Sequence, residues 1–317
     1  HIMTDIPNYY MIKEKGNIGL LTRRKLARLA FENTAHYESV ISNWFNKDIS
    51  EFCSKKSSIP LKKIKDLRYG ENPHQSGSYY EFGDNKITQI NGKNLSFNNI
   101  YDLESAVELS YEFKKNSCVI LKHGNPCGVA LDSLQHKAYK KALKCDKISA
   151  FGGVVAFNSE VTEKTALEIT KIFTEIVVAP SFSVKAKSIL AKKKNLILIK
   201  YKKSSNNQKF HIKSTSNFIL VQERDNKNII KPELVFKTVK KPSNSDINDM
   251  IFAFTVAKHV NSNAIVLASN LATIGIGIGQ TSRIESTKQA ISKMKLNYKK
   301  VKPVLASDGF FPFSDIV

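Results

Sequence analysis

The sequence predicts an α/β protein, and three observations support this prediction. Short apolar runs rich in β-branched residues alternate with segments whose apolar residues recur at helical spacing, as in a sheet covered by helices. The chain has 317 residues and a mass of 35.6 kDa, enough for about two or three folding units. Its 42% hydrophobic and 24% charged residues are typical of globular proteins and exclude a disordered chain or a coiled coil.

The elements follow in chain order. Residues 22–45 predict an amphipathic helix with a break near Asn33 and Thr34, and the polar residues 46–60 predict a linker. The predicted strands are 118–121, 153–157, 176–179, 196–199, 218–222, 264–268 and 273–276. The predicted helices are 103–113, 133–143, 163–173, 246–259 and 282–295. Residues 201–217 and 237–247 predict a polar excursion and a second linker, and no tandem repeat of fixed period is visible.

The net charge of +21 raises the hypothesis of a nucleic-acid partner. The 43 Lys and six Arg instead favour a solvated surface, because nucleic-acid sites rely on the planar fork of arginine. The four cysteines, at 53, 118, 127 and 145, form no C-x-x-C pair, which indicates neither a disulfide framework nor a zinc site and favours a reducing cytoplasm. No run approaches the ~20 apolar residues of a membrane span.

One segment, LRYGENPHQ (67–75), combines a predicted turn with two candidate binding side chains. Gly70 and the Asn72-Pro73 pair indicate the turn. The Arg68 guanidinium suits a phosphate or carboxylate, and Tyr69 adds a hydroxyl donor. The segment alone does not distinguish a binding site from an ordinary surface turn.

The segment CVILKHGNPCG (118–128) predicts a buried strand that ends in Lys122 and His123 and then turns. Ligand sites in α/β sheets lie at the carboxyl ends of strands. A lysine beside a histidine there can stabilise developing negative charge while the imidazole accepts a proton. The alternative is a loop whose Lys and His are satisfied by solvent.

Two glycine-rich segments are weaker indications of a ligand site. ISAFGGVV (148–155) allows close approach of a flat ligand, or it is a tight turn into a strand. IGIGIGQTSR (274–283) leads into a predicted helix whose N-terminus could receive an anion, or it is a simple glycine-rich turn. It matches neither G-x-G-x-x-G after a first strand nor a Walker loop.

Together these segments resemble the bifunctional purine-biosynthesis family that carries 5-aminoimidazole-4-carboxamide ribonucleotide (AICAR) transformylase and IMP cyclohydrolase. The order and separation of the segments fit the family as well as their residues do. The matching segments are LRYGENPHQ (67–75), LKHGNPCG (121–128), SAFGG (149–153), VVAP (177–180), KKKN (192–195), SNAIV (262–266), IGIGIGQTSR (274–283) and SDGFFPFSD (307–315).

The resemblance implies two cytidine-deaminase-like α/β/α subdomains after a short helical N-terminal remnant, in an intertwined homodimer. Residues 1–50 would be the C-terminal remnant of the cyclohydrolase domain, 58–200 the first transformylase subdomain, and 201–247 an excursion and linker. Residues 248–317 would be a second subdomain that stops early. The chain would thus be a piece of a longer parent, cyclohydrolase activity is expected only in that parent, and truncation could leave this chain inactive.

The implied reaction is formyl transfer from 10-formyltetrahydrofolate, as co-substrate, to the 5-amino group of AICAR. No zinc follows, because the deaminase signature H-x-E…P-C-x-x-C is absent. Family members can also hold a potassium ion near the Ser262-Asn263 segment and Asp308. No membrane or specific nucleic-acid partner is implied. The alternative function is a catalytically inactive basic module that binds RNA or another polyanion.

The resemblance also implies a role for individual residues. His123 would be the general base, Lys122 its electrostatic partner, and Asn263 a hydrogen-bonding group near the reacting atoms. The implied AICAR-binding residues are Arg68, Tyr69, Asn99, Gly152, Glu175, Phe310 and Asp315. The implied folate-binding residues are Phe151, Arg283, Ile284 and Pro312.

Overall fold

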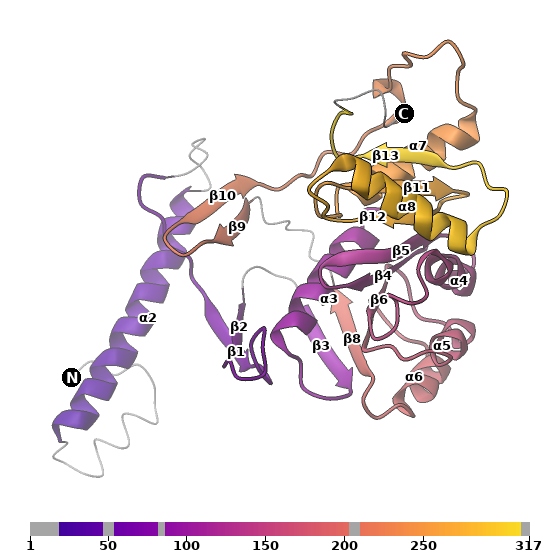
Figure 1. Cartoon of the computed structure of the whole chain (residues 1–317). Coiled ribbons are helices and arrows are strands. Elements are labelled where there is room, and N and C mark those ends of the chain that lie inside the picture. Colours follow the sequence, from indigo (N-terminus) through magenta and orange to yellow (C-terminus); the bar gives the residue numbers. More distant parts are fainter. Residues whose placement is uncertain (1–18, 47–53, 82–85, 203–209, 312–317) are drawn as a thin grey trace. The chain divides into compact units, whose positions relative to one another are not determined.

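The computed structural model describes residues 19–46, 54–81, 86–202 and 210–311. The predicted site residues Pro312 and Asp315 therefore lie outside the described residues. The chain separates into two compact units, each described here by itself. The first unit holds α2 (Leu20–Asn46), β1 (Lys62–Asp66) and β2 (Ser78–Glu81), and the second holds the 67–77 segment and all later described elements (Figure 1).

The first unit consists of one long helix and a two-stranded antiparallel sheet of β1 and β2. The predicted helix 22–45 is confirmed as α2, but the predicted break near Asn33 and Thr34 is wrong. The Thr34 hydroxyl donates to the carbonyl oxygens of Ala30 and Phe31, so its side chain bonds back to the preceding turn and the helix continues.

The second unit is built on a nine-stranded sheet with the order β13-β11-β12-β5-β4-β6-β7-β8-β3. Its strands are β3 (Lys86–Asn91), β4 (Ser117–Lys122), β5 (Asn125–Leu131), β6 (Val154–Phe157), β7 (Ile176–Ala179), β8 (Ile197–Lys202), β11 (Ile265–Ser269), β12 (Ala272–Gly277) and β13 (Val304–Ser307). A separate hairpin pairs β9 (Phe210–Ser214) with β10 (Ile219–Glu223). All seven predicted strands are present, and the predicted α/β fold class is confirmed.

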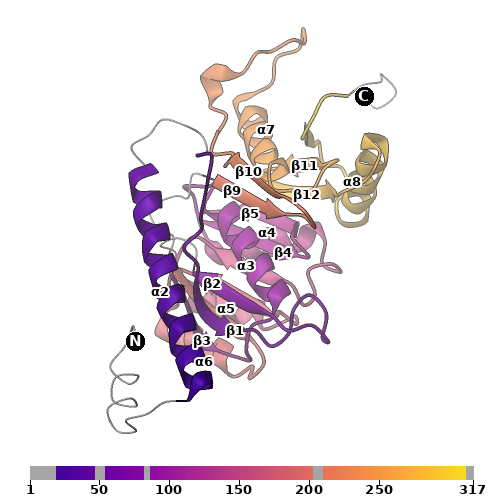
Figure 2. The same ribbon diagram turned by 90° about the vertical axis from the view of Figure 1, so that its left-hand side faces the viewer.

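Helices cover both faces of the sheet. They are α3 (Phe97–Ser110), α4 (Gln135–Cys145), α5 (Glu163–Ile169), α6 (Val184–Ala191), α7 (Asn244–Ala257) and α8 (Arg283–Asn297). One buried cluster joins α3 and α7 to the sheet, and two others join α4, α5, α6 and α8 to its opposite face. Figure 1 shows α3 on one side of β4 and β6 and α4 and α5 on the other, and in Figure 2 α3 lies in front of these strands.

The order helix, β-hairpin, helix occurs twice in the second unit, although the sequence shows no tandem repeat. The first copy is α3-β4-β5-α4 and the second is α7-β11-β12-α8. The two copies meet where β12 runs antiparallel to β5, with Ala272 opposite Ala130. Beside this pairing the buried Thr273 hydroxyl accepts the N–H of Val129 at 2.9 Å and donates to its carbonyl oxygen at 3.2 Å. One sheet thus spans both predicted subdomains, and their boundaries stay a prediction.

Candidate functional site

Several of the predicted site residues lie at one end of the nine-stranded sheet. Because β4 runs antiparallel to β5 and β6, the end of β4 meets the starts of β5 and β6. The parallel pairing of β6 with β7 and the antiparallel pairing of β12 with β5 and β11 bring the start of β7, the end of β12 and the start of β11 to the same end. We call this end of the sheet the candidate site. The predicted residues on these strand ends or within three residues of them are Lys122, His123, Phe151, Gly152, Glu175 and Asn263. Arg283 and Ile284 begin α8 after β12, and Phe310 follows β13, whose end pairs with the start of β11.

His123 occupies a two-residue turn between β4 and β5. Lys122 pairs with Asn125, and His123 and Gly124 have φ of 53° and 71°, the left-handed conformation of a tight hairpin turn. Gly124 is required here, since a Cβ would lie 2.5 Å from the Tyr101 ring. The His123 side chain is exposed, so the turn presents an accessible imidazole.

Asp102 of α3 forms hydrogen bonds with the backbone of this turn. Its carboxylate accepts the N–H of His123 at 3.1 Å and the N–H of Gly124 at 2.7 Å. Burial raises the pKa of Asp102, and the two backbone N–H groups oppose this increase because they favour the charged form. The catalytic candidate is therefore fixed through its backbone by a buried carboxyl group.

Lys122 connects the β4–β5 turn to the segment before β6. Its ammonium group donates to the carbonyl oxygen of Phe151 at 2.8 Å. Phe151 is 58% exposed, and its ring centroid lies 5.3 Å from that of Phe173. Gly152 has φ of 73° and donates its N–H to the Phe173 carbonyl oxygen. A lysine and an accessible aromatic pair thus lie side by side at the candidate site.

Arg68 and Tyr69 lie beside the start of α3. The Arg68 guanidinium donates to the Tyr69 hydroxyl at 2.9 Å and stacks over the ring at 4.7 Å. The Tyr69 carbonyl oxygen accepts the N–H of Phe97, the first residue of α3. The same helix then carries Asp102 to the His123 turn, so α3 links the two predicted segments.

Asn99 and Glu175 already have partners within the protein. Asn99 accepts the N–H of Ser96 at 3.1 Å through its side-chain oxygen, in the capping box that starts α3. The Glu175 carboxylate pairs with Lys93 at 2.8 Å and is 16% exposed. Asn99 therefore stabilises the start of α3 in this structure, and the negative charge of Glu175 is balanced by Lys93.

The second half of the sheet contributes Asn263 and Arg283. The Asn263 amide donates to the carbonyl oxygens of Gln280 and Thr281, at 2.9 and 3.3 Å. Arg283 donates to the Ser307 hydroxyl at 2.7 Å and pairs with the carboxylate of Asp308. Asn263 thus anchors the loop after β12, and Arg283 ties the start of α8 to the end of β13.

Asn125 joins the two halves of the candidate site. Its side-chain oxygen accepts the N–H of Asn261 at 3.0 Å, and its amide donates to the His123 carbonyl oxygen at 3.1 Å. The segment that carries Asn263 is therefore linked directly to the turn that carries His123.

Asp102, Asn125 and Lys93 are site residues that the sequence analysis missed. Asn125 lies inside a matched motif, so its position was visible, but its contact with Asn261 was not. Asp102 and Lys93 lie 21 residues or more from their partners, and no local spacing indicates such contacts. Asp102 lies one residue before the predicted helix 103–113, so the helical pattern in the sequence did not mark it.

The described residues contain no group of three or more His, Cys, Asp and Glu side chains arranged to hold a metal ion. The three described cysteines are buried and free, and burial raises the pKa of the Cys127 thiol to about 12, so this cysteine is no thiolate nucleophile. Among the helices in the described part of the chain, none combines the length and apolar character needed to cross a membrane.

The fold and the site define an α/β protein whose polar side chains, drawn from both halves of one sheet, surround an exposed Lys-His turn. A family model described as AICARFT/IMPCHase bienzyme matches residues 3–293. The chain belongs to this family, as its motifs predict.

Curated relatives agree with this assignment. The chain is 43% identical over 325 residues to the bifunctional purine biosynthesis protein PurH of Caldicellulosiruptor saccharolyticus and 45% identical over 318 residues to that of Persephonella marina. Both comparisons cover 96% of this chain and 61% of the relative. The PurH protein of Fusobacterium nucleatum is 42% identical, with 100% of this chain and 63% of the relative covered. The chain thus spans about three fifths of the length of these relatives.

Proposed function

We propose that the protein transfers a formyl group from 10-formyltetrahydrofolate to the 5-amino group of AICAR, a step of purine biosynthesis. The observation that carries the proposal is the gathering of the family's motif residues around the exposed His123 turn. In the reaction a bond forms between the amine nitrogen and the formyl carbon. The bond from that carbon to N10 of the folate breaks, one amine proton leaves, and N10 gains a proton.

The residues of the turn match the needs of this reaction. The His123 imidazole is exposed and would accept the amine proton. Lys122 has three N–H donors, of which one is engaged by Phe151, so the others can stabilise the oxyanion that forms on the formyl group. Asn263 would fix the loop after β12, and its side-chain oxygen would accept a hydrogen bond near the reacting atoms.

The proposed binding roles are those that the family resemblance implies. Arg68, with Tyr69 stacked against it, would bind the AICAR phosphate, because a guanidinium pairs well with phosphate oxygens. The exposed ring of Phe151 would contact the flat folate. Gly152, Glu175 and Phe310 would complete the nucleotide site, while Arg283 and Ile284 would shape the folate site at the start of α8.

Potassium does not fit the described residues. Asp308, the expected carboxylate ligand, is paired with Arg283, whose positive charge opposes a nearby cation. We therefore leave potassium out of the proposed mechanism.

We further propose that the protein acts as a homodimer in a reducing cytoplasm. The β9–β10 hairpin pairs with no other described strand, and β10 is exposed along its whole length, with Phe218 just before it 70% exposed. An exposed apolar strand of this kind favours contact with another protein surface. Equilibrium sedimentation tests the dimer.

Membership of the family favours the enzyme over the polyanion-binding alternative. The experiment that separates them is a formyl-transfer assay, followed as tetrahydrofolate production, on wild type and the His123→Ala and Arg68→Ala variants, with AICAR binding measured by calorimetry. We expect His123→Ala to lower transfer by about 100- to 10,000-fold, the usual contribution of a general base, and to keep AICAR binding. Arg68→Ala should weaken binding roughly 10-fold or more through the lost phosphate contact. A wild type that transfers no formyl group, yet binds RNA with steep salt dependence, would support the alternative.

A further inference from the structure

We propose that Asp102 is a positioning residue for His123, because its carboxylate fixes the β4–β5 turn and so presents the imidazole in one orientation. The part of this inference that concerns catalysis rests on the proposed function. The part that concerns the turn rests on the contacts alone.

The two oxygens of the Asp102 carboxylate have separate tasks. Oδ2 accepts the N–H of His123 and Oδ1 accepts the N–H of Gly124. The Asp102 side chain is buried on α3, a helix whose start is fixed by the Ser96 capping box. A residue other than glycine is disfavoured at the φ of 53° that His123 adopts, so the turn needs contacts that stabilise this conformation.

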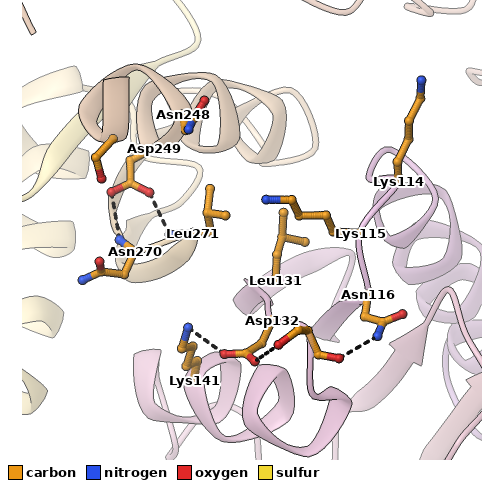
Figure 3. Close-up of a pocket in the computed structure, with 12 residues that line it drawn as sticks. Lys114, Lys115, Asn116, Leu131, Asp132, Lys141, Asn248, Asp249, Asn270 and Leu271 are labelled. Atoms are coloured by element: carbon orange, nitrogen blue, oxygen red, sulfur yellow. Dashed lines mark hydrogen bonds and ion pairs between the residues drawn. The ribbon is translucent and has the colours of Figure 1, made fainter. Parts of the chain in front are cut away.

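The same arrangement occurs at the second hairpin, without a catalytic candidate. Asp249 of α7 accepts the N–H groups of Asn270 and Leu271, at 2.8 and 2.7 Å (Figure 3). In both hairpins the turn residues follow the aspartate by 21 and 22 residues, and Asn270 and Leu271 also have positive φ. The fold therefore uses one contact twice, and the two copies can be compared directly.

The second turn lies far from the candidate site. Because β12 runs antiparallel to β5, the start of β12 lies at the opposite end of the sheet from the start of β5. There Asn270 and Leu271 line an open cleft of about 720 Å³, together with Lys114, Lys115 and other polar residues (Figure 3). Removing the Asp249 carboxylate should loosen a turn of the same kind without moving His123.

The experiment compares Asp102→Asn with Asp249→Asn in the formyl-transfer assay. Asparagine keeps the size of the side chain, but its amide group can accept only through one oxygen. We expect Asp102→Asn to lower kcat roughly 10- to 100-fold while KM for AICAR changes little, since a misplaced catalytic group slows chemistry rather than binding. Asp249→Asn should leave kcat within about threefold of wild type, because its turn carries no catalytic group.

A double-mutant cycle tests whether Asp102 acts through His123. If it does, Asp102→Asn lowers the residual rate no further in the His123→Ala background, since the group that it positions is gone. Additive losses, or equal kcat losses in the two aspartate variants, would overturn the inference and leave Asp102 with a general role in stability. Thermal unfolding of each variant shows that the compared proteins are folded.

Amide hydrogen exchange provides a readout that does not need activity. The N–H of Gly124 should exchange faster in Asp102→Asn than in wild type, and that of Leu271 faster in Asp249→Asn. Unchanged protection of Gly124 in Asp102→Asn would overturn the inference even if the proposed function holds. A wild type without formyl transfer would refute the proposed function, and the exchange result would still decide whether Asp102 holds the turn.

Discussion

We expect the stability difference between wild type and a Glu104 variant to depend on pH, because of the environment of Glu104 on α3. Burial raises the pKa of this carboxyl group from its ordinary value of 4.5 to about 7, and the nearby charge of Glu108 adds to the effect. Arg224, which pairs with Glu108, and a hydrogen bond from Tyr201 oppose it. Between pH 4.5 and about 7, Glu104 is thus largely protonated in the folded protein, while the same carboxyl group is largely charged in the unfolded chain.

The sign follows from this order of pKa values. Below pH 4.5 the carboxyl group is protonated in both states, and its contribution to the free energy of unfolding is fully present. Between pH 4.5 and about 7 the unfolded chain releases the proton first, so this contribution is progressively lost. At about 1.36 kcal/mol for each pH unit, the full loss is about 3 kcal/mol, and about 2 kcal/mol after allowance for the partial exposure of Glu104.

Glu104→Gln replaces the carboxyl group with an uncharged amide of the same shape. We expect the variant to match wild type near pH 4.5 and to exceed its free energy of unfolding by about 2 kcal/mol at pH 8. Urea unfolding at several pH values measures this difference, and Glu285→Gln on the exposed face of α8 serves as a control with no such trend. A difference between Glu104→Gln and wild type that stays constant from pH 4.5 to 8 would refute the reasoning.

Two further predictions concern packing between the elements of the sheet. Gly128→Ala should lower the free energy of unfolding, measured by urea titration, by about 3 kcal/mol, because a Cβ there would overlap the Ala142 carbonyl oxygen of α4. Gly19→Ala is the control and should cause no such loss, because the space around its Cβ is open. Equal stability of Gly128→Ala and wild type would show that α4 can move away. Thr273→Val should lower the same free energy by about 1–3 kcal/mol, because both backbone groups of Val129 lose a buried partner. Thr255→Val, whose hydroxyl only bonds back within α7, is the matched control, and equal effects would contradict a special role for the β5–β12 junction.

The sequence predicted the central strands because they are buried on both faces. β7 (IVVA) is apolar throughout and β11 (IVLAS) is apolar up to its last residue, which is the pattern of a strand covered by helices on both sides. β5 was missed because Asn125, Pro126 and Gly128 are typical of turns. Pro126 is accommodated where the register between β4 and β5 shifts. The start of α3 was also missed, because Asn98 and Asn99 in its first turn are residues typical of turns.

The site was predicted in part. Short motifs located the residues at the strand ends, because the residues of each motif are neighbours of one another in the sequence. Contacts between residues far apart in the sequence could not be predicted. Examples are the contacts of Asp102 with His123, Lys93 with Glu175 and Asn125 with Asn261. Such contacts depend on how helices and strands pack, and the pattern of a single sequence carries no direct signal for them.

The junction between β5 and β12 also bears on how the protein folds. Val129 and Thr273 are 144 positions apart in the chain, so this pairing closes a very long loop. Contacts of such high sequence separation slow folding, because the chain loses much of its conformational freedom before they form. Asn125 and Asn261, which connect the two halves of the candidate site, lie on either side of the same junction. We therefore expect a newly made chain to acquire the complete candidate site only late in folding, when both hairpins have formed and joined into one sheet.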